Sequence, residues 1–162
     1  MDSFKNKDTK NIIVQCDISN YDDVKNLVET AYSNFNTVDV LINNAGIASG
    51  GLMLMTSISE LKKVFQINYF SQVQITQYIA KMMLRKNRGS IILMSSVLGM
   101  DSRPGATSYG ASKAAIALFA KTADFQTHIP AQFCIQVGKR LVQQQHPRLD
   151  CERSGQSHTL LL

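Results

Sequence analysis

Short apolar runs alternate along this chain with longer segments in which apolar side chains recur at helical spacing. The runs at 11–16, 38–43 and 90–95 are rich in Ile, Val and Leu, as buried strands are. Helices are expected at 21–35, from about 59 to 85 with a break near Asn68, and at 108–122. Ser57 and Glu60 are typical capping residues for the start of the second helix. Strands that alternate with helices predict an α/β fold built on a parallel sheet.

The composition limits the functions that the chain could serve. Its 162 residues, 44% of them hydrophobic, predict one core. The net charge of +5 is spread thinly, and the densest basic stretch, 81–88, is explained as a helix end whose dipole favours cations. We therefore expect no nucleic-acid partner. Three cysteines, no leader and no apolar run of spanning length predict a cytoplasmic protein without a membrane partner.

Histidines and cysteines gather toward the end of the chain, but their spacing matches no zinc signature. These residues are His128, Cys134, His146, Cys151 and His158. We expect no metal site.

The residues best suited to chemistry are Ser96, Tyr109 and Lys113. Tyr109 and Lys113 lie four apart, on one face of the expected helix, which places an ammonium beside a phenol. A positive charge there favours the phenolate, so Tyr109 is suited to exchange a proton with a substrate oxygen. Ser96 follows the strand 90–95, at the edge where open α/β sheets bind ligands, and its hydroxyl is expected to bond the same oxygen. The pattern indicates a carbonyl/alcohol redox site.

The Tyr-x-x-x-Lys spacing alone is weak evidence, because a chain of this length shows it by chance roughly 0.3 times. Tyr21 and Lys25 form a second match, on a charged helical stretch that we interpret as a solvated face. For Tyr109 the alternative is a helix-starting tyrosine followed by an exposed lysine. The strand-end Ser96 and the turn around Gly99 favour the redox interpretation.

The segment Asn44, Ala45 and Gly46 follows the strand 38–43. Small residues at a strand end let the backbone approach a dinucleotide closely. The alternative is a simple turn.

Three stretches, in order along the chain, resemble motifs of the short-chain dehydrogenase/reductase family. They are LINNAGI at 41–47, GSIILMSSV at 89–97 and SYGASK at 108–113. The resemblance covers about residues 11–122. It implies hydride transfer between NAD or NADP and a ketone or secondary alcohol, with a 3-oxoacyl thioester on carrier protein as the implied substrate. Which of the two cofactors is used cannot be read from the sequence.

The resemblance implies four catalytic residues. Ser96 would orient the carbonyl, Tyr109 would act as the acid/base, and Lys113 would support Tyr109 while bonding the nicotinamide ribose. Asn68 matches the fourth position, which helps to hold the lysine and a proton-relay water. The alternative for Asn68 is a polar residue that kinks a core helix.

The resemblance also implies a set of cofactor-binding residues. Asp17, with Ile18 beside it, looks like the residue that contacts the adenine, although by itself Asp17 would be an ordinary helix cap. The remaining members are Asn44, Ala45, Gly46, Tyr109 and Lys113.

Both ends depart from the family pattern. The phosphate-binding motif Thr-Gly-x-x-x-Gly-x-Gly does not occur in the sequence. The expected fold is therefore a partial doubly wound, Rossmann-like sheet over 1–122 that lacks the first two strands and the usual C-terminal strands, followed by a divergent tail at 123–162. In the family's strand order, 3-2-1-4-5-6, the run 11–16 would lose its neighbours. It would then move beside 38–43, pair with another chain, or remain loose.

Two functions from different classes follow. The first is an NAD(P)-dependent oxidoreductase. The second is a catalytically silent relative that acts as an association module, since the family's counterparts of helices 59–85 and 108–122 commonly pack across a subunit interface. The same helices imply a homo-oligomer.

Overall fold

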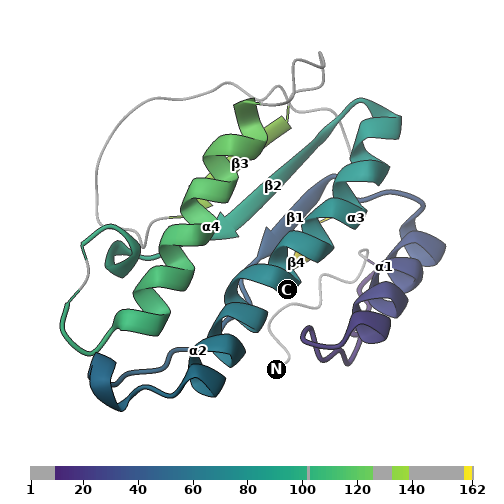
Figure 1. The fold of residues 1–162 in the computed structure, drawn as a ribbon. Coiled ribbons are helices and arrows are strands. Elements are labelled where there is room, and N and C mark those ends of the chain that lie inside the picture. The colour runs from purple at the N-terminus through teal and green to yellow at the C-terminus, as the bar shows by residue number, and fades with distance from the viewer. Residues whose placement is uncertain (1–9, 102, 126–132, 139–158, 162) are drawn as a thin grey trace.

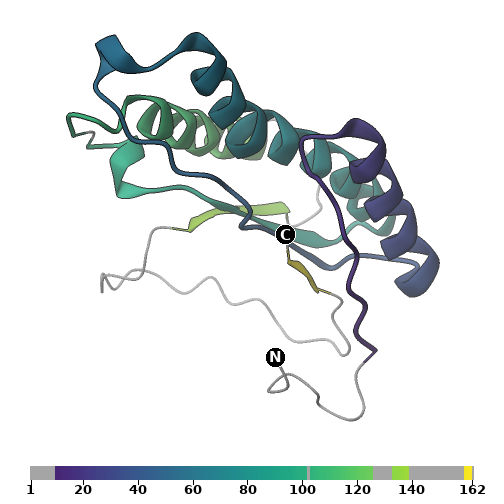
Figure 2. The same ribbon diagram turned by 90° about the horizontal axis from the view of Figure 1, so that it is seen from below.

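Four parallel strands form one sheet, and the helices of the chain pack on one face of it (Figures 1 and 2). The computed structural model describes residues 10–101, 103–125, 133–138 and 159–161. The strands are β1 (Val40–Asn43), β2 (Gly89–Met94), β3 (Phe133–Gly138) and β4 (Thr159–Leu161), in the order β3-β2-β1-β4. The helices are α1 (Tyr21–Phe35), α2 (Ile58–Phe65), the π-helix η2 (Gln66–Phe70), α3 (Ser71–Lys86) and α4 (Thr107–Phe125), with short 3-10 turns η1 (Met53–Met55) and η3 (Val97–Gly99). The predicted α/β fold with a parallel sheet is confirmed.

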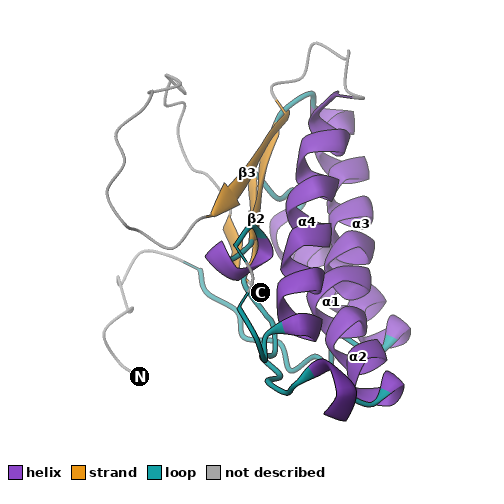
Figure 3. Cartoon of the chain, turned by 60° about the vertical axis from the view of Figure 1, so that its left-hand side comes forward, coloured by secondary structure: helices purple, strands orange, loops and turns teal. Residues whose placement is uncertain are grey.

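The core lies between the sheet and the helical layer (Figure 3). Burial alternates along β1 and β2, so Leu41, Ile91 and Leu93 are fully buried while their neighbours are partly exposed. This two-residue period is that of a strand with one face turned to the core. The helices contribute Val24 and Val28 from α1, Ile75, Ile79 and Met83 from α3, and Ile116 and Ala120 from α4.

Local capping residues determine where the helices begin. The side chain of Asn20 accepts hydrogen bonds from the backbone amides of Asp22 and Asp23 at the start of α1. Ser57 accepts from the amide of Glu60 at 3.2 Å, so the predicted cap of the second helical segment is confirmed. Each side chain satisfies amides that have no partner within the helix.

The second helical segment is continuous but changes its winding. Its predicted break near Asn68 is a π-helical turn over 66–70, between α2 and α3. The basic stretch does lie at a helix end, since α3 stops at Lys86, and Arg88 pairs with Asp39 at 3.0 Å. Among the described residues, no helix has both the length and the apolar character needed to cross a membrane.

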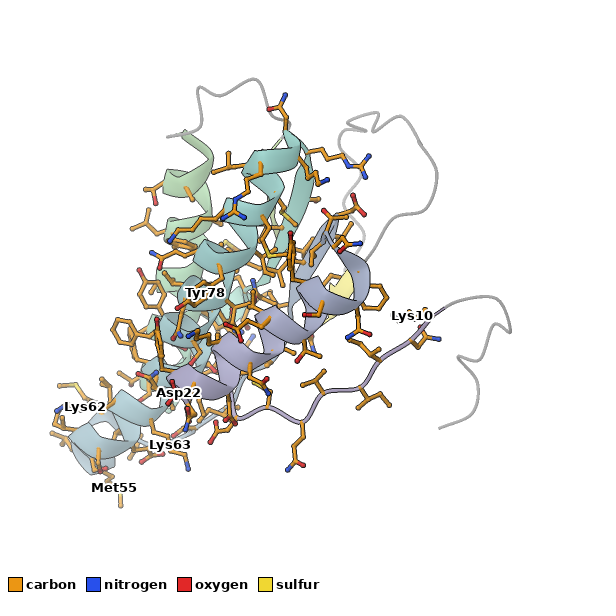
Figure 4. The ribbon with its side chains drawn as sticks, turned by 90° about the vertical axis from the view of Figure 1, so that its right-hand side faces the viewer. Lys10, Asp22, Met55, Lys62, Lys63 and Tyr78 are labelled. Atoms are coloured by element: carbon orange, nitrogen blue, oxygen red, sulfur yellow. The ribbon has the colours of Figure 1, made fainter. Side chains whose placement is uncertain are left out.

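Side chains on the outside of the helical layer are visible in Figure 4. Tyr78 of α3 meets Tyr21 of α1 edge to face, with ring centroids 6.3 Å apart, where the two helices pack together. At the other end of the layer, Met55, Lys62 and Lys63 project away from the body of the protein.

The predicted strand at 11–16 is wrong. This stretch pairs with no described strand, and Ile13 is 95% exposed, although Cys16 and Ile18 pack against the core. The first of the three outcomes expected for it, a place beside 38–43, is wrong, and its pairing with another chain stays a prediction. The edge of β1 is occupied instead by β4, which runs parallel to it with Leu41 opposite Leu160.

The chain after residue 122 contains more regular structure than its composition indicates. Helix α4 continues to Phe125, and β3 follows it and pairs with β2 along its whole length. No helical or alternating pattern marks β4 in the sequence. His128, His146, Cys151 and His158 lie outside the described residues, as does the side chain of Cys134.

Candidate active site

Three of the predicted site residues meet beyond the carboxyl ends of β1 and β2. Gly46 comes from the loop after β1, Asn68 from the π-helix, and Lys113 from α4. A Cβ atom built on Gly46 would lie 3.2 Å from Asn68 Oδ1 and 3.5 Å from Lys113 Nζ. An alanine at this position would press on Asn68 Oδ1 and touch Lys113 Nζ at an ordinary contact distance.

Asn68 is fully buried and all of its hydrogen-bonding atoms have partners. Its Nδ2 donates to the carbonyl of Ile47 at 2.9 Å and to Ser112 Oγ at 3.0 Å, while its Oδ1 accepts from the amide of Ile47 at 2.8 Å. Ser112 Oγ in turn donates to the carbonyl of Tyr109 at 2.7 Å. Asn68 thus joins the loop after β1 to the first turns of α4.

Lys113 is a buried cation, with 4% of its surface exposed. Its Nζ donates to the carbonyl of Met94 at 2.7 Å, and in the described part of the chain no carboxylate pairs with it. Burial lowers the pKa of Lys113 below the ordinary value of 10.5, because a charged amine loses hydration there. An ammonium has three donors and Met94 accepts one bond, so others are available for a ligand.

Ser96 follows the end of β2, and Tyr109 lies in the first turn of α4. Lys113 Nζ lies 5.9 Å from the centroid of the Tyr109 ring, as their spacing on one helical face predicts. Ser96 caps η3 and accepts from the amide of Leu98 at 3.3 Å. Both side chains are partly buried, and among the described contacts no hydrogen bond joins their hydroxyl groups.

The turn that carries Ser96 is held closely against α4. Ser95 Oγ donates to the carbonyl of Lys113 at 2.8 Å. A Cβ on Gly99 would lie 2.8 Å from Ala114 N, closer than such atoms approach, so only glycine allows this packing. The loop before α4 is also tied to the loop after β1, since Gly51 donates to the carbonyl of Gly105 at 2.9 Å.

Asp17 and Ile18 lie apart from this cluster. Asp17 is exposed, and its Oδ1 accepts from Ser19 Oγ at 2.7 Å and from the Ser19 amide at 2.9 Å. These bonds, the hydroxyl first, lower the pKa of Asp17. Asp17 therefore closes a turn before α1, whose cap is Asn20, and no described contact joins it to Asn68 or Lys113. Ile18 packs against the core.

The loop residues predicted to face a dinucleotide differ in exposure. Asn44 and Gly46 are exposed, whereas Ala45 is partly buried and its carbonyl accepts from Gln72 Nε2 at 2.7 Å.

Sequence reasoning overlooked several residues that hold the site together. Ser95 and Ser112 belong to the quoted motifs, but their own contacts were not predicted. Gln72 and Thr76 follow Asn68 at intervals of four on the helix face that also buries Ile75 and Ile79. That spacing was the available signal, because a buried polar side chain needs a partner.

A surface depression of about 280 Å³ between η3 and α4 is separate from this cluster. Its lining includes Thr107, Gly110 and Ala114 of α4 but neither Tyr109 nor Lys113.

An open parallel sheet with polar residues gathered beyond the carboxyl ends of its strands defines a class, the α/β proteins with a Rossmann-like sheet, which bind ligands at this edge. Comparison with known proteins narrows the class. The model of the family described as short chain dehydrogenase matches residues 1–137, so the match continues beyond residue 122, where the resemblance was expected to end. The chain belongs to the short-chain dehydrogenase family.

Curated relatives are similar over two thirds or more of the chain. A 3-oxoacyl-[acyl-carrier-protein] reductase from Synechocystis is 37% identical over 111 residues, which is 68% of this chain and 45% of that protein. The reductase FabG of Staphylococcus epidermidis is 32% identical over 123 residues, 76% of this chain and 50% of that protein. The chain spans about half the length of the curated relatives that it matches.

Solved structures show the same arrangement. A short-chain dehydrogenase/reductase from Burkholderia phymatum, in complex with NAD, matches with a TM-score of 0.74 and 29% identity, over 79% of this chain and 46% of that one. ElxO with NADP bound matches with a TM-score of 0.70 and 27% identity, over 77% of this chain and 50% of that one.

Proposed function

We propose that this chain carries the catalytic residues of an NAD(P)-dependent oxidoreductase that interconverts a ketone and a secondary alcohol. The observation that carries the proposal is Lys113, a buried ammonium whose recorded partner is a carbonyl rather than a carboxylate. Burying a charge is costly unless the charge is paired. Buried cations that have no carboxylate partner and have donors left over are typical of ligand sites.

The residues around Gly46 fit a dinucleotide. Gly46 carries no side chain beside Lys113 Nζ, which has donors left for the hydroxyl groups of a ribose. Two structural neighbours were solved with NAD and with NADP bound, which supports this class of cofactor without choosing between them. When bound, a nicotinamide supplies or accepts the hydride.

Each catalytic role follows from position. Tyr109 would exchange the proton with the substrate oxygen, because its hydroxyl is the titratable group on the same helical face as Lys113. Lys113 would stabilise negative charge on that oxygen and hold the ribose. Ser96 would donate a hydrogen bond to the substrate oxygen, and Asn68 would hold the loop and α4 in place.

The names of the relatives point to a substrate class. Both reductases act, by name, on a 3-oxoacyl group attached to acyl carrier protein. We propose a 3-oxoacyl thioester as the first substrate to test.

Replacing Tyr109 with Phe tests the function. We expect Tyr109→Phe to abolish NAD(P)H-dependent reduction of a 3-oxoacyl thioester, because the acid/base hydroxyl is gone. Tyr21→Phe is the matched control, since Tyr21 begins the other Tyr-x-x-x-Lys segment, and it should keep full turnover. Unchanged turnover in Tyr109→Phe, or none in the folded wild type, would contradict the proposal.

A second candidate is an association module, favoured by exposed apolar side chains on the helices. Phe70 of η2 is 55% exposed and Leu118 of α4 is 63% exposed, in the segments whose family counterparts form subunit contacts. We propose a homo-oligomer through these helices. Light scattering should give a mass above that of one chain, which Leu118→Asp should lower, and a monomeric wild type would contradict the proposal.

A further inference from the structure

A row of polar side chains on one helix face binds alternate residues of the loop after β1. Three pairs of residues are joined, and we refer to them as the polar ladder. They are Asn43 with Thr76 (Nδ2 to Oγ1, 3.0 Å), Ala45 with Gln72 (O to Nε2, 2.7 Å) and Ile47 with Asn68 (2.8 and 2.9 Å).

The ladder is possible because four residues of helix and two residues of extended chain cover nearly the same distance. Four residues of an α-helix advance by about 6.0 Å, at roughly 1.5 Å each. Two residues of extended chain advance by about 6.6 Å, at roughly 3.3 Å each. The step of four from 72 to 76 in α3 therefore stays level with the step of two from 45 back to 43, with the segments running in opposite directions, and the π-helical turn at 66–70 places Asn68 opposite Ile47.

Gln72 and Thr76 are buried at positions where an apolar side chain would pack at lower cost. They are 1% and 4% exposed, on the face of α3 that also carries the core residues Ile75 and Ile79. Gln72 Oε1 has no partner among the described residues, so its amide is retained at some cost for the single bond to Ala45. The bond to the carbonyl of Ala45 is therefore what distinguishes Gln72 from an apolar residue at this position.

We propose that Gln72 and Thr76 are positioning residues that set the backbone of the loop 43–47 at the site. This inference rests on the proposed function, because the loop is the one expected to face the dinucleotide. The two side chains act through the loop and touch neither substrate nor cofactor. They make α3 and the loop one unit, so that Gly46 stays beside Lys113 before any ligand arrives.

Amide hydrogen exchange, followed by NMR on the full chain without cofactor, tests the ladder. In the wild type, the amide of Ile47 should exchange far more slowly than that of exposed Ala48. Gln72→Met keeps the length of the side chain but removes the donor. It should speed exchange at Ile47 by about tenfold relative to Ile79 of α3, as the loss of one buried hydrogen bond predicts. Gln77→Met, at an exposed position of the same helix, is the control.

Thr76 provides a second and milder pair of variants. Thr76→Val removes the hydroxyl that accepts from Asn43 and should speed exchange at Ile47, whereas Thr76→Ser keeps that hydroxyl and should restore the slow rate. The affinity for NADPH should fall and recover in the same order.

Two results would overturn the ladder. The first is equal exchange rates for the amides of Ile47 and Ala48 in the wild type. The second is a ratio of the Ile47 rate to the Ile79 rate that stays at its wild-type value in both Gln72→Met and Thr76→Val. A wild type that binds no dinucleotide would instead overturn the proposed function, because the exchange measurement needs no cofactor.

Discussion

Asn68 and Ile47 are joined by two hydrogen bonds, one in each direction, between a side-chain amide and a backbone peptide group. The side-chain amide of Asn68 bonds Ile47 as a neighbouring strand would, because it satisfies both the backbone N–H and the backbone C=O of that residue. The π-helical turn at 66–70 supplies this side chain. Extra turns of this kind are frequent at functional sites, and here the turn aims a buried amide at the loop after β1.

Asn68→Asp should destabilise the protein. The substitution keeps the shape of the side chain but replaces its donor with an oxygen, which leaves the carbonyl of Ile47 without its partner. A buried polar group left unpaired costs about 1–3 kcal/mol, so the free energy of unfolding in urea should fall by that amount. Asn44→Asp makes the same change at an exposed position and should stay within about 0.5 kcal/mol of the wild type. Equal stabilities of the two variants would contradict this role of Asn68.

Gly99→Ala should also destabilise the protein, for a steric reason. The new methyl group would lie 2.8 Å from two backbone atoms of α4, Ala114 N and Lys113 C, and neither atom can turn aside. Overpacking of this kind costs about 1–3 kcal/mol, which a lower thermal midpoint would report. Gly50→Ala is the control, since its methyl group would meet Gly105 O at an ordinary 3.6 Å. An unchanged midpoint for Gly99→Ala would show that η3 does not pack as described.

Local patterns in the sequence predicted β1, β2 and the main helices, but not β3 or β4. The strands that became β1 and β2 and the helices that became α1, α3 and α4 all bury a periodic apolar face, which sequence records directly. The run 11–16 has the same composition, but no adjacent strand accepts its backbone, and Ile13 is left almost fully exposed. An apolar run indicates that a segment is able to form a strand, whereas strand pairing depends on residues far away in the chain.

The site could be predicted where chemistry requires particular residue types, and less well where geometry decides. Lys113 and Tyr109 lie near each other as their spacing predicts, and Asn68 is linked through Ser112 to the backbone carbonyl of Tyr109. Asp17 carries the expected residue type and bonds Ser19 in its own turn, and its contact with the adenine stays a prediction. The ladder residue Gln72 was missed because its partner is a backbone carbonyl, which no side-chain motif records.

Stability should depend on the charge of Lys113 at alkaline pH. Burial lowers the pKa of Lys113 in the folded chain below 10.5, so the unfolded chain binds this proton more tightly. The free energy of unfolding should therefore rise with pH between the lowered pKa of the folded chain and 10.5. Below that window Lys113 is charged in both states, and the folded chain bears the full cost of burying the charge. Urea unfolding of the wild type and of Lys113→Met at a series of pH values measures this effect. As the pH rises, the free energy of unfolding of the wild type should increase relative to that of Lys113→Met. Parallel pH curves would contradict the assignment of a buried, charged lysine.

Binding of NADH and NADPH, followed by nucleotide fluorescence on a sample shown to be folded by circular dichroism, tests the central claim most directly. The wild type should bind at least one nucleotide with a micromolar dissociation constant. Lys113→Met should weaken binding by about tenfold or more, because a charge-assisted hydrogen bond is lost. Lys121→Met, at an exposed position on the same helix, should bind as the wild type does. A folded wild type that binds neither nucleotide, or equal affinity in Lys113→Met, would contradict the claim that the cluster around Lys113 is a dinucleotide site.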